Sequence, residues 1–168
     1  MHILVIADAD AGPAHALERA LALAGTGGRI SLIGFVHERL GGIGAEVAQQ
    51  VADALLRERE RQLRTLAAAH DRHIETQSVW EKHIAAWVCS QVGRLGADLV
   101  IKTGHRSENW HYTPTDWQLI RACPVPVLIV PERPWRKRGT VLAAVDLGTR
   151  LASKRALNLK VVSSARDL

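Results

Sequence analysis

Short runs of apolar residues alternate along the chain with longer segments in which apolar residues recur every three or four positions. The runs are bounded by turn-forming residues, which predicts buried strands at residues 3–7, 30–37, 74–80, 98–103 and 125–130. The periodic segments predict helices at residues 14–24, 46–70, 82–95 and 115–122. Strict alternation of strand and helix is typical of an α/β fold: an open, mainly parallel five-stranded sheet with helices on both faces.

Turn-forming residues mark where several of these helices begin and end. Gly25, Gly27 and Gly28 follow the first helix, and Gly96 follows the third, where a glycine commonly ends a helix. The fourth helix starts at Pro114 and has Asp116 in its first turn, and both residue types are favourable there.

The second helix is predicted to be the longest and the most highly charged. Its outer face carries a run of alternating arginine and glutamate at residues 57–61, which suits contact with solvent. The residues expected on or near its apolar face are Val47, Val51, Leu55, Leu63 and Leu66.

An open parallel sheet usually binds its ligand beyond the carboxyl ends of the strands, at the point where the strand order reverses. We expect Asp8, Val36 and the loop after Thr103 to lie close to one another there. Asp8 has two interpretations: it contacts an adenine or ribose, or it is a helix N-cap or strand-end turn residue.

The end of the chain repeats its beginning. Residues 141–148 read VLAAVDLG, and residues 3–10 read ILVIADAD; both stretches are predicted strands that lead into a helical pattern. We therefore expect three parts: a domain at residues 1–132, a basic linker at 133–139, and a β-α piece that begins a second, truncated domain at 140–168. Because one strand and one helix cannot bury their own apolar faces, this piece docks on the first domain or on another chain, or the natural protein is longer.

Residues 97–130 read ADLVIKTGHRSENWHYTPTDWQLIRACPVPVLIV and resemble the C-terminal half of a universal stress protein domain. In that family a strand similar to ADLV leads to a glycine loop, G-x2-G-x9-G-[ST], then to a helix and a strand similar to CPVLVV. The stretch TPTDWQLIRACPVPVLIV is similar to the tandem UspE type, in which one chain holds two such domains. The resemblance implies an adenine nucleotide alpha hydrolase-like, or Rossmann-like, sheet.

In nucleotide-binding members the resemblance implies a pocket assembled from three places. The first is an aspartate after the first strand, here Asp8, and the second is a backbone group at the end of the second strand, near Val36. Glycines of the third, the loop, let N–H groups approach phosphate oxygens, and the next helix adds positive potential. The loop equivalents in this chain are Gly104, His105, Arg106, Ser107, Thr113 and Thr115.

The loop of residues 102–115 departs from the family pattern. Lys102 stands where the first glycine is expected and His105 where the second is. Thr113 and Pro114 replace the Gly-Ser that would contact the terminal phosphates, and proline has no N–H to donate. These changes argue against bound ATP or AMP, so no cofactor is predicted.

Several side chains in or beside this loop have two interpretations each. Arg106 either meets an anion or is an ordinary surface residue. Trp110, Tyr112 and Trp117 either stack on a base or line an apolar pocket, or they fill the space that a nucleotide would occupy.

Metal, disulfide and membrane chemistry are not indicated. The histidines nearest the loop match no compact ligand spacing, so no metal site is predicted. Cys89 and Cys123 lie far apart with no CxxC, which predicts neither a disulfide framework nor a zinc site. The first apolar run is too short for a signal peptide or a membrane span, and we expect a cytoplasmic protein without a membrane partner.

The net charge of +5 is concentrated in the basic stretch after residue 132. We interpret that stretch as a solvated linker and do not expect nucleic acid as a partner. The sequence has no G-x-S-x-G, P-loop or GxGxxG, and no acid–base arrangement, so no enzyme activity is predicted.

The leading hypothesis is a non-catalytic stress-response module that acts through dimerisation or protein interaction. The family resemblance implies that the last strand, Val125 to Val130, pairs with a counterpart, which predicts a homodimer; docking of the C-terminal piece is the other route. The alternatives are an AMP- or ATP-binding stress sensor, a nucleotide hydrolase or adenylating enzyme, and a binder of an apolar or lipid-like ligand.

Overall fold

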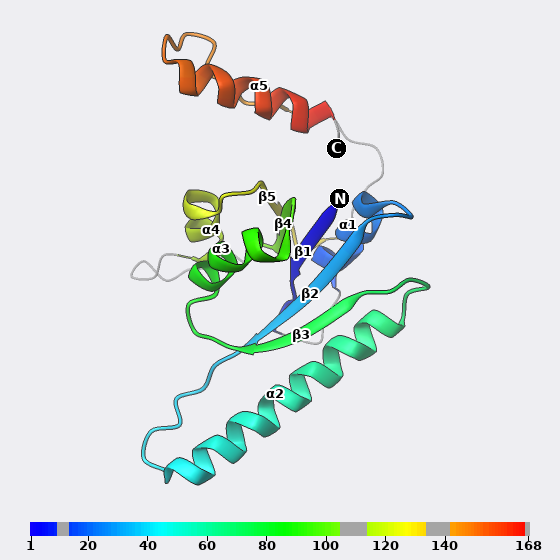
Figure 1. Ribbon diagram of the computed structural model, residues 1–168, viewed down its shortest axis with the longest axis vertical. Helices are drawn as coiled ribbons and strands as arrows, with labels where there is room; N and C mark the ends of the chain where they lie inside the picture. Colours follow the sequence, from blue (N-terminus) through cyan, green and yellow to red (C-terminus); the bar gives the residue numbers. More distant parts are fainter. Residues whose placement is uncertain (10–13, 105–113, 134–141, 167–168) are drawn as a thin grey trace. The chain divides into compact units, whose positions relative to one another are not determined.

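The structure is a computed structural model that describes residues 1–9, 14–104, 114–133 and 142–166 (Figure 1). The chain divides into two compact units, Met1–Pro134 and Trp135–Leu168.

The first unit is an open α/β sheet, as predicted. Its strands lie side by side in the order β3-β2-β1-β4-β5, and every neighbouring pair is parallel. The strand order reverses between β1 and β4, which therefore flank the expected ligand position. The strands are β1 (His2–Ile6), β2 (Arg29–Val36), β3 (Glu75–Trp80), β4 (Leu99–Thr103) and β5 (Val127–Val130). The helices are α1 (His15–Ala24), α2 (Ala45–Ala68), α3 (Ile84–Leu95) and α4 (Thr115–Ala122).

Two apolar layers hold the helices on the two faces of the sheet (Figure 1). Along β1 the side chains alternate: Ile3 and Val5 pack under α1 and α2, whereas Leu4 and Ile6 pack under α3 and α4. Because both faces of β1 are covered, its sequence is a continuous apolar run after His2.

The predicted helix ends are confirmed. Gly25 follows α1 with φ 58°, and Gly96 follows α3 in the left-handed conformation with φ 64°. Pro114 is the N-cap residue of α4, and Asp116 lies in its first turn. The strand β5 begins later than predicted, because Pro126 lacks the N–H that a ladder needs.

The long helix α2 corrects two predictions. Arg59, expected on the outer face with the rest of the charged run, is only 7% exposed. Val47, expected on the apolar face, is exposed, because α2 continues beyond the sheet at its N-terminal end (Figure 1). The buried residues of α2 are Arg59 and Leu63.

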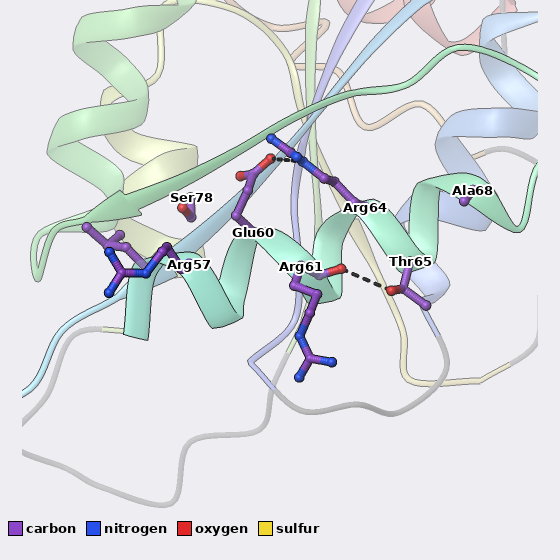
Figure 2. A pocket seen from close by; sticks show the side chains of 8 residues that line it. Arg57, Glu60, Arg61, Arg64, Thr65, Ala68 and Ser78 are labelled. Atoms are coloured by element: carbon purple, nitrogen blue, oxygen red, sulfur yellow. Dashed lines mark hydrogen bonds and ion pairs between the residues drawn. The ribbon is translucent and has the colours of Figure 1, made fainter. Parts of the chain in front are cut away.

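The outer edge of β3 is covered by a side chain of α2 (Figure 2). The Glu60 carboxylate accepts hydrogen bonds from Thr76 Oγ1 at 2.6 Å and from Arg64 Nε at 3.0 Å, and the nearby backbone N–H of Ser78 also favours its charged form. Burial alone would raise the pKa of Glu60, but these three donors lower it overall. Glu60 therefore lies beside a backbone N–H that an added strand would need.

The second unit contains one helix, α5 (Ala152–Arg166), among its described residues. The strand predicted at residues 141–148 is wrong over residues 142–148, which form no strand. A strand needs a pairing partner, and the described residues of this unit supply none. Instead, the Asn158 side chain accepts from the Asp146 N–H at 3.1 Å and donates to the Asp146 carbonyl at 2.7 Å.

Candidate functional site

The candidate site lies where β1 and β4 end, at the reversal of strand order. Thr103 Oγ1 donates a hydrogen bond to Asp8 Oδ2 at 2.8 Å. The predicted proximity of Asp8 to the end of the fourth strand is thereby confirmed. Asp8 is not a helix cap, because α1 begins at His15 with Ala14 as its N-cap residue. Of its non-ligand interpretations, the strand-end turn residue is the one that fits.

Arg59 reaches this position from α2. Its Nη2 donates to the carbonyl oxygens of Ala7 at 3.3 Å and Asp8 at 2.5 Å. Burial lowers the pKa of the Arg59 guanidinium, while the Asp8 carboxylate raises it; an arginine nevertheless stays charged in proteins. The buried Arg59 thus places a fixed positive charge beside Asp8.

A glycine in β2 makes room for this arginine. A Cβ on Gly34 would lie 2.5 Å from Arg59 Nε and 3.0 Å from a methyl group of Leu63. A glycine inside a buried strand often marks a close approach by another group. Gly34 is thus a signal in the sequence for a close approach at β2, although it does not identify Arg59 as the residue that approaches.

Lys102 lies within β4 and not in a loop. Its Nζ forms an ion pair with Asp116 Oδ1 at 2.8 Å and donates to the Thr103 carbonyl at 2.6 Å. Its side chain is 9% exposed, and that of Asp116 is 16% exposed. The position expected to hold the first loop glycine is thus occupied by a buried cation, already paired with the first turn of α4.

Gly104, the first residue after β4, is held closely by β5. Its N–H donates to the Val130 carbonyl at 2.8 Å, which extends the sheet by one hydrogen bond. A Cβ at this position would lie 2.6 Å from Ile129 Cγ2 and 3.5 Å from Asp116 Oδ2. Only glycine fits here, and its N–H is engaged by the sheet.

The remaining predicted site residues fall into two groups. The carbonyl of Val36, at the end of β2, accepts a hydrogen bond from the Glu81 N–H at 3.0 Å, and Thr115 is the half-buried first residue of α4. The rest lie outside the described residues: His105, Arg106, Ser107 and Thr113. The aromatic pair Trp110 and Tyr112 lies outside them too.

The hollow beside Asp8 is small. The residues that line it include Val5, Ala7, Ala14 and Leu32, and its volume is about 10 Å³. Pockets for small molecules typically enclose about 300–1,000 Å³, whereas about 10–15 Å³ holds one water. The hollow that the described residues line is of the size of one water molecule.

At the opposite end of the strands, the buried residues His2 and Ser31 form a hydrogen-bonded chain with the exposed Glu75. Ser31 Oγ donates to Glu75 Oε2 at 2.9 Å and lies 2.9 Å from His2 Nε2. A hydrolytic triad places the histidine between the serine and the carboxylate; here the serine is in the middle, and Nδ1 of His2 faces the Leu95 carbonyl at 3.0 Å. This chain links the amino ends of β1, β2 and β3 and lacks the order that nucleophilic catalysis needs.

The described residues offer neither a metal cluster nor a membrane-spanning helix. Residues 1–9, 14–104, 114–133 and 142–166 hold no cluster of three or more His, Cys, Asp or Glu side chains suited to a metal ion. Among the same residues, every helix is too short or too polar to cross a bilayer.

Comparison with known proteins identifies the family to which the chain belongs. The model of the universal stress protein family matches residues 1–131. The chain belongs to the universal stress protein family. Universal stress protein E of Escherichia coli K12 is 37% identical over 98 residues, which make up 56% of this chain and 31% of that relative. The matched part thus spans less than a third of the relative's length.

Solved structures share the fold of this chain. A functionally unknown protein from Pseudomonas aeruginosa PAO1 has a TM-score of 0.64 and 29% identity, covering 99% of this chain and 55% of that one. A universal stress protein family protein from Arabidopsis thaliana with AMP bound has a TM-score of 0.55 and 12% identity, covering 79% of this chain and 92% of that one. At that identity the second likeness shows the shared fold alone.

As a universal stress protein, the chain keeps the family's sheet, and several groups at the ends of β1 and β4 contact one another or neighbouring elements. Asp8 is bonded to Thr103, Lys102 to Asp116, and the Gly104 N–H to β5. Two of these six groups, Lys102 and Asp116, carry opposite charges that neutralise one another.

Proposed function

We propose that this universal stress protein domain is a non-catalytic stress-response module that acts through protein interaction and has lost its nucleotide site. The observation that carries the proposal is the ion pair between Lys102 and Asp116. In this pair the Asp116 carboxylate lies at the position where the loop of nucleotide-binding members would bind phosphates.

The electrostatics oppose a phosphate there. Asp116 Oδ2 lies 3.5 Å from where a Cβ on Gly104 would stand, so its negative charge faces the first residue of the loop. A phosphate placed nearer to that carboxylate than to the Lys102 ammonium would be repelled in a poorly solvated site. Lys102, the cation that would compensate, is already paired.

The free edge of the sheet supports an interaction role. Among the described strands β5 pairs only with β4, and Trp117 and Ile120 on the adjacent α4 are 65% and 55% exposed. At the other edge Glu60 lies beside the Ser78 N–H. We therefore propose a homodimer that forms through β5 and the apolar side of α4.

The directions of the backbone hydrogen bonds in β5 show which substitution would test the proposed dimer. The carbonyls of Pro126 and Val130 accept from β4, so the N–H groups of Val127 and Ile129 point away from it. We expect light scattering over a concentration series to show a dimer for the natural sequence and a monomer for Val127→Pro. Gln77→Lys, an exposed change on β3, is the matched control and should remain dimeric. A monomer of the natural sequence at every concentration would refute the dimer.

Loss of the nucleotide site is tested separately. Calorimetry with ATP, AMP and Mg²⁺ should show no heat, and mass spectrometry of the purified protein should release no nucleotide. A measurable heat would instead support the second candidate function, an AMP- or ATP-binding stress sensor. That candidate is favoured by the AMP bound to the Arabidopsis relative and by the presence of Asp8 and Thr103 at the reversal of strand order.

A further inference from the structure

The two cysteines of the chain come together where α3 packs on α4. Cys89 lies within α3, and Cys123 is the C-cap residue of α4. Both side chains are half-buried and pack against the same apolar layer beneath these helices. Cys123 is close enough to Cys89 to help raise the pKa of its thiol. Because the two cysteines lie far apart in the sequence, no disulfide was predicted; the fold brings them to the same pair of helices.

The surroundings give the two thiols different roles. Burial, followed by the neighbouring Cys123, raises the pKa of Cys89. Cys89 therefore holds its proton at neutral pH and is a slow nucleophile toward an oxidant, since the thiolate is the reactive form. We therefore expect Cys89 to react in the second step, with a neighbouring cysteine that has already been oxidised.

We propose that Cys89 and Cys123 form a reversible disulfide on exposure to hydrogen peroxide. The Cys123 sulfur attacks one peroxide oxygen, the O–O bond breaks, and a sulfenic acid and one water form. The Cys89 sulfur then attacks the Cys123 sulfur, the S–S bond forms, and the S–O bond breaks. The hydroxyl leaves with the Cys89 proton as a second water, so two thiols and one peroxide give one disulfide and two waters.

The disulfide would fasten the end of α4 to the middle of α3. The closed segment contains β4, Gly104 and both partners of the Lys102–Asp116 ion pair. It also contains the exposed side chains of Trp117 and Ile120. Oxidation would therefore act on the helix that carries the proposed interaction surface, although the disulfide itself does not depend on that surface.

The test is peroxide treatment of the full chain, followed by trypsin digestion without reductant. We expect peptides 83–94 and 122–136, which contain Cys89 and Cys123, to be joined. The intact mass should be that of a single chain that has lost two hydrogen atoms, and thiol reductant should restore the starting mass. Cys89→Ser and Cys123→Ser should each abolish the joined peptides.

The single variants also test the order of reaction. Cys89→Ser leaves Cys123 without its partner, so a dimedone adduct of a sulfenic acid should accumulate on Cys123. Cys123→Ser should give much less adduct on Cys89 after the same treatment. Thiols that stay unmodified, thiols oxidised to sulfinic acids without joining, or a disulfide between two chains would each overturn the proposal.

Discussion

Lys102 Nζ lies 2.8 Å from Asp116 Oδ1, and this ion pair joins the end of β4 to the first turn of α4. Both side chains are largely removed from solvent, so each depends on the other for compensation of its charge. The pair thus stabilises the contact between β4 and α4 at the edge of the sheet where open parallel sheets usually bind a ligand.

Replacement of Asp116 by asparagine should lower the free energy of unfolding by about 2–4 kcal/mol, because it leaves the buried Lys102 ammonium unpaired. Urea unfolding followed by circular dichroism measures the change. Adding Lys102→Met to the variant should recover much of the loss, since the charge is then absent. Asp71→Asn, at an exposed position, should be neutral. Equal losses in the single and double variants would contradict this account.

Replacement of Gly104 by alanine should lower the free energy of unfolding by about 1–3 kcal/mol through overpacking. The new Cβ would stand 2.6 Å from Ile129 Cγ2 and would push β5 away from the end of β4. The change in Tm reports the effect. Gly41→Ala is the control, because no atom lies within 4 Å of a Cβ there, and it should leave Tm close to that of the natural sequence.

Replacement of Arg59 by methionine should cost about 1–3 kcal/mol, since the carbonyls of Ala7 and Asp8 lose a buried donor. Arg57→Met removes the same charge from an exposed position two residues away and should cost little. Hydrogen exchange should rise in the amides at the end of β1 for Arg59→Met alone. A uniform rise in both variants would show that Arg59 has no local role.

Acid should weaken the domain through Glu60. Its pKa in the folded protein is below the ordinary 4.5, so the folded state binds fewer protons than the unfolded chain. The resulting stability is present above pH 4.5 and is lost as the pH falls through the lower, folded-state pKa. Urea midpoints measured below pH 4.5 should therefore fall less steeply for Glu60→Gln than for the natural sequence. Glu46→Gln, at an exposed position, should keep the full slope.

The sheet could be predicted because its information is local. Each buried strand is a short apolar run, and each helix carries its own periodicity and end signals such as Gly96. The strand predicted at residues 141–148 was wrong over residues 142–148 because a strand also needs information that is not local. An apolar run becomes a strand only where a neighbour offers hydrogen bonds, and the sequence of the run does not contain that neighbour.

The site was harder to predict because its contacts join distant residues. Five consecutive helical residues cover more than one turn, so the residues of the charged run at 57–61 cannot all face solvent. Which of them faces the sheet depends on Gly34, a residue of β2. Lys102 interrupts the apolar pattern of β4, and its partner Asp116 lies beyond the loop. The Asp8–Thr103 bond was foreseeable, because the fold rule brings those two strand ends together.

Glu60 has a consequence for stoichiometry. Glu60 lies beside the Ser78 N–H, which disfavours the addition of a further strand at the β3 edge of the sheet. The β5 edge is then the edge at which another strand can pair. Two copies joined through β5 would present only β3 sides at their outer limits. Growth by strand addition then stops at two, which makes a closed pair the natural end point and a fibre unfavourable.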